Sequence, residues 1–246
     1  MGGYFEFLRK KDDAEFTLFC FPHAGGTSEL YKNWDEIINE NCNVCILTLP
    51  GRGRMALEKP FQDISKVLEQ LSRDIESLLE KPFIFFGHSM GALISYELAK
   101  LLQKNFKKQP DHIYVSSYPA PHLLNENLIK DEINDAELII KLKELNGTPK
   151  EILSHKRFIK MLLPIIRADF AVLNSYNFKE GVILDCPITA IIGTNDNLNI
   201  EQAKEWFKHT TNMFTLKIYH GDHFYLNDLS IQNELGQLIE KDFAKL

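Results

Sequence analysis

The stretch FIFFGHSMGALISYELAK, residues 83–100, decides the fold. Four apolar residues lead directly into Gly87-His88-Ser89-Met90-Gly91, and a helical pattern follows at once. A serine on so sharp a strand-to-helix turn has a strained backbone, and the residues two before and two after it must be small. Gly87 and Gly91 meet that requirement, which predicts a nucleophile elbow with Ser89 at a helix N-terminus. The alternative is a glycine-bounded turn with an incidental serine, and the strand-like and helix-like flanks favour the elbow.

Apolar strand-like runs alternate with helical runs along the rest of the chain. Strands are predicted over residues 15–22, 43–51, 83–87, 111–121, 186–196 and 213–221, and helices over 28–39, 63–80 and 230–243. Asp63 is the expected N-cap of the second of these helices. Near-continuous apolar strands separated by helices are typical of a parallel sheet that is covered on both faces. We therefore expect an α/β fold with a mostly parallel central sheet flanked by helices.

The segment over about residues 121–181 interrupts this alternation, because it contains no clear strand. Asn134, with Glu137 three residues later, predicts one helix start, and residues 155–178 form one or two longer helices bent at Pro164. Both helical stretches are more apolar than a surface helix requires. We expect a helical lid over the site, because the insertion follows a strand at the end where the elbow opens. The alternative is an ordinary helical insertion packed on the core.

A serine nucleophile needs a base, and the chain has eight histidines. His223 lies in the loop after the last predicted strand, where such a fold presents its base, and Gly221 gives the backbone freedom to turn there. We favour His223 over its neighbour His220. His88 adjoins the serine and is expected to point away from it. The role of His122 stays open, and the histidines expected to be solvated are His112, His155 and His209.

The acid that orients the base is expected at the carboxyl end of a buried strand. Asp196 follows the apolar run ITAIIGTN, which would place it on the same edge of the sheet as Ser89. Asp169 and Asp222 are the rivals, but Asp169 lies in a predicted lid helix, and Asp222 adjoins the base, where backbone geometry opposes a good hydrogen bond. The order Ser89, Asp196, His223 is that of α/β hydrolases. We therefore predict these three residues as a catalytic triad on an α/β-hydrolase fold.

Residues 19–26, FCFPHAGG, end an early strand in a glycine pair. Glycines let a backbone approach a ligand closely, so this loop can supply an N–H group to an oxyanion hole. We expect the backbone N–H of Ala24 to act there together with that of Met90. His23 is expected to anchor the loop rather than to take part in catalysis. The alternative is a plain strand-to-helix turn.

Composition argues against several other classes of function. The chain of 246 residues has a net charge of −6 and no basic block, which argues against a nucleic-acid partner. Its N-terminal stretch lacks the apolar core of a signal peptide, and no apolar run approaches the roughly 18 residues of a membrane span. We expect a soluble cytoplasmic protein without membrane contact. It should form a single domain over residues 1–246, with the lid inserted at about 121–181.

The cysteines do not form a metal-site pattern. Cys42 and Cys45 make a lone C-x-x-C, without the second pair that a zinc site needs. They enter an apolar strand pattern. Together with Cys20 and Cys186 they are expected to be buried or half-buried thiols, and no metal site is predicted.

Several motifs together resemble one family over nearly the whole chain and in the right order. They are FCFPHAGG, Trp34, LPGRGRM, GHSMGA, RADFAVLNSY, IIGTND and GDHFYL. The chain is similar to the type II thioesterases of nonribosomal peptide and polyketide assembly lines, and its FPHAGG loop and RADF segment separate that family from generic lipases. Two places depart from the commonest pattern. Asp222 stands where a second glycine often precedes the histidine, and GRGRM is irregular after PGR, but neither departure removes a catalytic group.

The resemblance implies a free-standing hydrolase that removes stalled or wrong acyl groups from carrier proteins. The substrate would hang on the phosphopantetheine arm of an acyl or peptidyl carrier protein, so the enzyme would need no cofactor of its own. It is expected to act as a monomer. The alternatives are a medium-chain acyl thioesterase of fatty-acid synthesis, a carboxylesterase, and a catalytically inert binding protein that keeps the fold.

The two faces of the predicted lid helices carry different expectations. The apolar face should border the acyl chamber, with Leu138, Leu142, Phe158 and Leu162. A carrier protein usually presents an acidic recognition surface, so basic residues near the lid are candidate contacts unless they are only solvated helix faces. These candidates are Lys141, Lys143, Lys156, Arg157 and Lys160.

Overall fold

The computed structural model describes residues 3–124, 134–145 and 156–244. Within these ranges one sheet of seven strands has the order β1-β3-β2-β4-β5-β6-β7. Strands β2 to β7 run parallel to their neighbours, whereas β1 runs antiparallel to β3 at one edge. This confirms the predicted mostly parallel sheet. The strands are β1 (Phe5–Arg9), β2 (Phe16–Phe21), β3 (Cys42–Leu47), β4 (Phe83–His88), β5 (His112–Ser116), β6 (Ile188–Gly193) and β7 (Phe214–Tyr219).

Helices cover both faces of this sheet. They are α1 (Trp34–Ile37), α2 (Ile64–Ile75), α3 (Met90–Phe106), α4 (Asp135–Leu145), α6 (Lys156–Asn174), α7 (Ile200–Lys204) and α8 (Leu229–Phe243). Side chains along β4 alternate between the two faces, as a pleated strand requires. Phe83 and Phe85 belong to the buried cluster that includes α2 and α3, and Ile84 and Phe86 belong to the cluster that includes α1 and α8. The sheet is therefore apolar on both sides, as the near-continuous apolar strands predicted.

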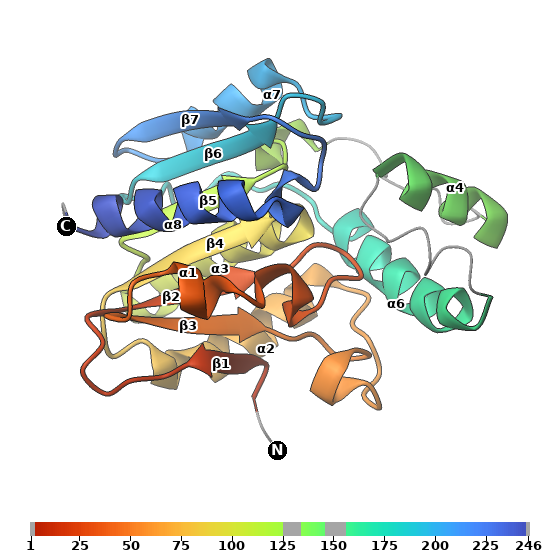
Figure 1. The fold of residues 1–246 in the computed structure, drawn as a ribbon, viewed down its shortest axis with the longest axis horizontal. Coiled ribbons are helices and arrows are strands. Elements are labelled where there is room, and N and C mark those ends of the chain that lie inside the picture. Colours follow the sequence, from red (N-terminus) through yellow and green to blue (C-terminus); the bar gives the residue numbers. More distant parts are fainter. Residues whose placement is uncertain (1–2, 125–133, 146–155, 245–246) are drawn as a thin grey trace.

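Helices α4 and α6, which come between β5 and β6 in the chain, lie beyond the carboxyl ends of the strands, on the side to which the strand arrows point (Figure 1). The predicted start of α4 is confirmed, because the Asn134 side chain accepts from the N–H of Glu137 at 3.0 Å and the Glu137 side chain accepts in return at 3.1 Å. An ion pair of 2.6 Å between Arg167 and Asp135 joins α6 to α4. Helix α6 continues through Pro164 as one element.

Two parts of the fold differ from the prediction. Strand β1 was not predicted, because it has only five residues and its apolar positions are interrupted by Glu6 and ended by Arg9. The helix predicted over residues 28–39 is instead a 3₁₀ turn at Ser28–Tyr31 followed by the single turn of α1. Trp34 is buried as expected, so the apolar spacing indicated the buried face correctly. The extended backbone of Ile38, with ψ 140°, ends the helix after one turn.

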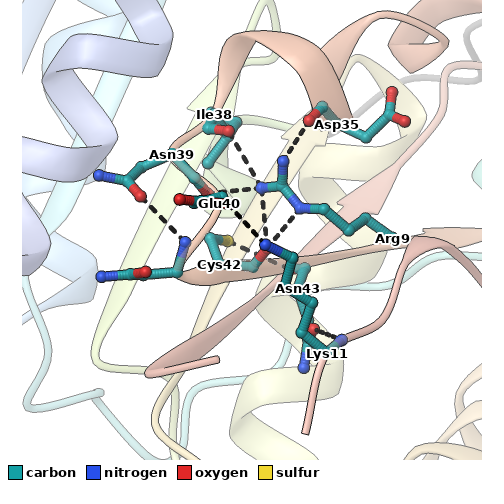
Figure 2. Close-up of polar contacts among 9 residues, drawn as sticks. Arg9, Lys11, Asp35, Ile38, Asn39, Glu40, Cys42 and Asn43 are labelled. Carbon is teal, nitrogen blue, oxygen red and sulfur yellow. Dashed lines mark hydrogen bonds and ion pairs between the residues drawn. The ribbon is translucent and has the colours of Figure 1, made fainter. Parts of the chain in front are cut away.

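Arg9 joins the edge strand to the chain around α1, as Figure 2 shows. Its guanidinium donates to the carbonyl oxygens of Asp35, Ile38, Asn39 and Cys42. These carbonyls lie at the end of α1 and the start of β3, where helix bonding has stopped and the sheet has not yet begun. One cation therefore pairs backbone groups that would otherwise need water.

The four cysteines are buried and free, as expected. Burial raises the pKa of Cys42 and of Cys186 to about 12, so both thiols stay protonated at neutral pH. In the described ranges, no helix combines the length and the apolar character needed to cross a bilayer.

Candidate active site

The turn between β4 and α3 has the backbone expected of an elbow. Ser89 has φ 54° and ψ −120°, which lies outside the regions that most residues occupy. A Cβ on Gly91 would lie 1.9 Å from the carbonyl oxygen of Phe21, and one on Gly87 would lie 2.3 Å from the carbonyl oxygen of Gly91. Neither position can hold a side chain without moving the backbone. The N–H of Ser89 donates to the carbonyl of Ser116 at 2.8 Å, which ties the turn to the end of β5.

His223 and Asp196 meet from the ends of two neighbouring strands. Asp196 follows β6, and His223 lies in the loop after β7, where Gly221 has φ 138°. Nδ1 of His223 is 3.0 Å from Oδ1 of Asp196, and the two side chains are 13% and 1% exposed. Because Nδ1 faces the carboxylate, Nε2 is the ring nitrogen that can exchange a proton with a nucleophile.

The environment of Asp196 keeps its carboxylate ionised. Burial alone raises the pKa of Asp196, but the hydrogen bond and the charge of His223 lower it, and Ser117 and the N–H of Leu198 lower it further. The balance leaves the pKa below its usual value. An ionised carboxylate at this position can stabilise the imidazolium that forms when the histidine accepts a proton.

Ser117 is a site residue that the sequence reasoning missed. It follows β5 directly, has φ 53°, and donates its N–H to the carbonyl of Ile191 at 2.8 Å. Its hydroxyl is 3.5 Å from the carbonyl oxygen of His223 and contributes to the lowered pKa of Asp196. The available signal was the polar pair Ser116-Ser117 inside the strand predicted over residues 111–121, next to the strand that carries the acid.

His88 lies behind the base in a buried hydrogen-bond chain. Its Nδ1 is 2.8 Å from Oγ of Ser116, which is in turn 2.5 Å from the hydroxyl of Tyr225. The ring centroids of His88 and His223 are 5.2 Å apart. Burial lowers the pKa of His88 well below its usual value, so the ring is neutral. A neutral ring in this place packs against the base without adding charge to the site.

The loop after β2 adjoins the N-terminus of α3. Residues 23–26 form a tight turn in which the N–H of Gly26 donates to the carbonyl of His23 at 2.9 Å. Gly91 of α3 lies against the backbone at the start of this loop. Met90 is the first residue of α3, so its N–H has no partner inside the helix. The oxyanion hole predicted from the N–H groups of Ala24 and Met90 is compatible with this arrangement and stays a prediction.

Asp169, the rival acid, is held by other partners. It is 2% exposed, and each of its oxygens lies 2.6 Å from a different guanidinium nitrogen of Arg52. One of these oxygens also accepts from the N–H of Gly25 at 2.6 Å. Sequence reasoning missed the partnership, although Arg52 lies in the PGR motif and Asp169 in the RADF motif. The carboxylate that pairs with His223 is therefore that of Asp196.

The predicted chamber residues on α4 and α6 occupy different environments. Leu138 and Leu142 are buried in the cluster that contains α2 and α3, and Leu162 is half-buried. Leu162 lies close to the loop of residues 23–26, called the glycine loop below, since its Cδ1 would be 3.8 Å from a Cβ on Gly25. The side chain of Phe158 lies outside the described part of the chain.

Three of the basic candidates for partner contact are exposed: Lys143, Arg157 and Lys160. They come from α4 and the first half of α6. The side chains of Lys141 and Lys156 lie outside the described part of the chain. A role in partner contact stays a prediction for all five.

Two histidines that were expected to be solvated are buried, so those predictions were wrong. His112 is 6% exposed and pairs with a threonine hydroxyl of β6 at 2.9 Å. His209 is 5% exposed and contacts the hydroxyl of Tyr96 at 2.9 Å and a nitrogen of His122 at 2.8 Å. A neutral imidazole can be buried once its nitrogens are hydrogen-bonded, and the polar sequence around each residue did not reveal those partners. His155 lies outside the described residues.

The arrangement as a whole is suited to acyl transfer through a covalent intermediate. It combines a strained serine at a helix N-terminus with a histidine oriented by an ionised carboxylate on the same edge of the sheet. A helix N-terminus also favours the negative charge that develops on a carbonyl oxygen under attack. Across the described residues, no three His, Cys, Asp or Glu side chains group as metal ligands would.

Comparison with known proteins points to one family. A family model described as a thioesterase domain matches residues 16–243. The chain is 38% identical over 232 residues to linear gramicidin dehydrogenase LgrE of Brevibacillus parabrevis, covering 93% of this chain and 88% of that protein. It is 35% identical over 247 residues to the medium-chain S-acyl fatty acid synthase thioesterase of Homo sapiens, covering 96% of this chain and 92% of that protein.

A solved structure agrees with the observed fold. The type II thioesterase BorB from the borrelidin biosynthetic cluster superposes with a TM-score of 0.88 at 30% identity. The match covers 97% of each chain. The likeness therefore extends over nearly the whole chain.

Proposed function

The chain belongs to the thioesterase family, and from that membership we propose that it is an editing enzyme of an assembly line. Its task would be to hydrolyse stalled or wrong acyl groups from the phosphopantetheine arm of carrier proteins in nonribosomal peptide or polyketide synthesis. Support comes from the likeness to a type II thioesterase of a biosynthetic cluster over almost the whole chain. The name of LgrE describes a dehydrogenase, and that activity is not carried over, because the site of this chain is built for acyl transfer.

The observation that carries the proposal is the meeting of Asp196 and His223 at the strand edge where Ser89 stands in its strained turn. A nucleophile, a base and an ionised orienting acid are the three parts that serine-based acyl transfer requires. All three residues are present in this chain. An inert binding protein of the same fold would have no need of this arrangement.

The reaction would proceed in two halves. Ser89 Oγ attacks the thioester carbonyl while Nε2 of His223 takes its proton, and the N–H groups of Met90 and Ala24 stabilise the oxyanion. The C–S bond then breaks, and the pantetheine thiolate leaves with the proton from His223. In the second half His223 deprotonates a water molecule, which attacks the acyl-serine ester. The ester C–O bond breaks, Oγ of Ser89 takes the proton back from His223, and the acid is released. Asp196 stabilises the imidazolium in both halves.

The helices between β5 and β6 would act as the lid of this site. The apolar side of α4 and α6, with Leu138, Leu142 and Leu162, would border the acyl group. The substrate arrives on the arm of its carrier, so the reaction needs no cofactor bound by the enzyme. We also propose that the enzyme works as a monomer in the cytoplasm.

A second candidate function is that of a medium-chain acyl thioesterase of fatty-acid synthesis, which the likeness to the human medium-chain thioesterase supports. An enzyme of that kind would select acyl groups by chain length, whereas an editing enzyme should accept many short acyl groups. The two functions share the triad and differ in the chamber, so the triad geometry alone does not separate them.

Substrate preference tests the proposal. We expect kcat/KM to be highest for short acyl groups, of several kinds, attached to a phosphopantetheinylated carrier protein. The comparison substrates are medium-chain acyl groups on the same carrier and simple esters of the same acids. A clear preference for medium chains would favour the fatty-acid function, and a preference for simple esters would indicate a carboxylesterase. Failure to hydrolyse any of them would mean that the protein only binds.

A further inference from the structure

A buried ion pair joins three segments that lie far apart in the sequence. Arg52 comes from the loop after β3, Asp169 from α6, and the N–H that shares the carboxylate from Gly25 in the loop after β2. The Arg52 and Asp169 side chains are 4% and 2% exposed. Arg52 also donates to the carbonyl of Gly26 at 3.4 Å. The ion pair therefore holds the loop of residues 23–26 through two backbone groups, the N–H of Gly25 and the carbonyl of Gly26.

The held N–H is one residue away from the N–H expected to stabilise the oxyanion. Gly25 follows Ala24 directly, and the peptide group between them is planar, so fixing the N–H of Gly25 also fixes the carbonyl side of Ala24. An oxyanion donor must be in place before the reaction begins, because its advantage over water lies in being preorganised. A displacement of about 1 Å at such a donor can reduce the rate on the order of a hundredfold.

Helix α6 holds the same loop by packing. A Cβ on Gly25 would lie 2.8 Å from Cγ1 of Ile166 and 3.8 Å from Cδ1 of Leu162. Gly25 has φ 74°, a conformation that suits glycine. The loop is thus pressed by apolar side chains of α6 and bonded by a carboxylate of the same helix. These contacts leave the loop little freedom to move as long as α6 keeps its position.

Charge explains why Arg52 accompanies the carboxylate. A lone anion next to the glycine loop would repel the negative charge that develops on the substrate oxygen. For unit charges roughly 7 Å apart at an effective dielectric constant of about 20, this repulsion would slow the reaction on the order of tens-fold. Two parallel hydrogen bonds from the guanidinium neutralise Asp169, and one of the two bonded oxygens also accepts from the N–H of Gly25.

We infer that Arg52 and Asp169 are positioning residues that hold the loop of residues 23–26 in the form required for an oxyanion hole. The inference rests on the proposed function, because it assumes that Ala24 supplies an oxyanion donor to a thioester. Neither residue touches the reacting atoms. They act through the backbone of Gly25. Because Asp169 belongs to α6, the position of α6 also affects how well the site can stabilise an oxyanion.

The test is a double-mutant cycle with Asp169→Asn, Arg52→Gln and the combined variant, using a small free acyl thioester. We expect kcat to fall on the order of ten- to a hundredfold in each single variant, with KM changed less than about threefold. Arg52→Gln should be the more damaging because it leaves the carboxylate alone. The combined variant should recover part of the loss of Arg52→Gln, since no unpaired charge remains.

A second readout separates positioning from mere stability. Ser89 adds to the carbonyl of a trifluoromethyl ketone analogue of the thioester, and the carbonyl oxygen becomes an oxyanion in the same hole. Its inhibition constant should rise in each variant by about the factor by which kcat falls. The combined variant has no unpaired buried charge, so it can still be measured if a single variant fails to fold. It should bind the ketone less tightly than the wild type and more tightly than Arg52→Gln where both fold.

Asp135→Asn is the matched control. It removes the other ion pair of α6, with Arg167, without touching the glycine loop, and it should leave kcat and ketone binding unchanged. The inference is overturned if the variants at 52 and 169 lower the melting temperature but keep wild-type kcat and ketone affinity, or if their effects simply multiply. Activity in Ser89→Ala would instead overturn the proposed function, and that outcome is distinct from these.

Discussion

The carboxylate of Asp196 offers the sharpest prediction at the scale of single residues. Asp196→Asn should reduce kcat on the order of ten-thousandfold, because an amide cannot stabilise the imidazolium and favours the wrong tautomer of His223. The variant should stay folded, since it keeps the size of the side chain. Steady-state hydrolysis of an acyl thioester, together with a thermal melt, measures both effects.

Asp222→Asn is the control for this variant. Asp222 lies next to the base, and its Oδ1 accepts from the N–H of Phe224 at 2.8 Å, which an amide oxygen can still do. Its kcat should remain within about threefold of the wild type, as for most substitutions that leave a contact in place. If Asp222→Asn or Asp169→Asn lost more activity than Asp196→Asn, the assignment of the acid would be wrong.

The sequence located the residues of the proposed triad more readily than the residues around them. Ser89, Asp196 and His223 each follow a strand, and their order along the chain is that of α/β hydrolases, but their catalytic roles stay predictions. Ser117 and Arg52 contact the carboxylates of Asp196 and Asp169, which lie 79 or more positions away in the chain, and no local sequence pattern indicates such contacts. Arg52 lies in one of the family motifs and Ser117 does not, but the partner of each could be identified only in the fold.

At the scale of elements, the elbow depends on the approach of α3 to the backbone after β2. Gly91→Ala would place a methyl group 1.9 Å from the carbonyl oxygen of Phe21, closer than any real contact. Either the turn must open or α3 must move away from the sheet. We expect loss of hydrolysis together with destabilisation of about 3 kcal/mol or more, at the upper end for point substitutions. Urea unfolding and turnover should be measured on the same preparation.

Gly181→Ala is the matched control for this prediction. A Cβ on Gly181 would meet nothing within 4 Å, and its φ lies outside the positive range that side chains rarely adopt. The free energy of unfolding should change by less than about 1 kcal/mol, in either direction, and turnover should be unchanged. Equal damage from both substitutions would show that the close approach of α3 is not what the elbow requires.

Periodicity predicted the buried elements and one edge strand, and it missed the other edge strand. Strands β2 to β6 and helices α2, α3 and α8 have long apolar patterns, because each is buried against a neighbour. Strand β7 lies at one edge and is mostly half-buried, but its apolar run was recognised, whereas the five-residue strand β1 at the other edge was missed. Residues 28–39 were predicted as one helix because their apolar spacing is helical. The backbone instead breaks at Asn33 and Ile38.

At the scale of the whole molecule, the net charge of the protein bears on the proposed docking of a carrier protein. The protein has a net charge of −6, so long-range attraction to an acidic carrier should be weak and docking should depend on a local basic patch. Reversing Lys143, Arg157 and Lys160 to Glu should raise KM for a carrier-bound thioester. Hydrolysis of a small free thioester should be unchanged, because the patch lies outside the catalytic machinery.

The control reverses three exposed lysines on other helices: Lys66 on α2, Lys104 on α3 and Lys241 on α8. It changes the net charge by the same amount and should leave both substrates unaffected at physiological ionic strength. An equal rise of KM in both triple variants would indicate a general charge effect. Equal loss on both substrates in the first variant would mean that the substitutions had disturbed the packing of α4 and α6 and not a docking contact.

Buried neutral histidines should make the stability of the whole fold depend on pH. Burial lowers the pKa of His23 to about 3, of His88 well below its usual value, and of His209, with the help of His122, to about 4. The unfolded chain takes up these protons as the pH falls below about 6.5, whereas the folded chain does not. The stabilisation is therefore complete above pH 6.5 and is lost progressively as the pH falls toward 4.

Between pH 7.5 and pH 5, the free energy of unfolding in urea should fall by about 2 kcal/mol for each of these three histidines, or about 6 kcal/mol in all. His209→Gln should show a smaller fall over the same range, because it removes one of the groups that titrate only in the unfolded chain. A free energy of unfolding that stayed constant or rose toward pH 5 would mean that these histidines are not held neutral in the folded protein.

The central claim is that Ser89 is the nucleophile in the hydrolysis of a carrier-bound thioester. The most direct measurement is the turnover of an acyl carrier protein by Ser89→Ala, relative to the wild type, with a thermal melt to confirm that the variant is folded. Loss of a triad member should reduce kcat on the order of a million-fold, leaving only the contribution of binding and the oxyanion hole. A folded Ser89→Ala variant that kept as much as about a tenth of wild-type turnover would contradict the account, because no residue that the site retains could replace the serine at that rate.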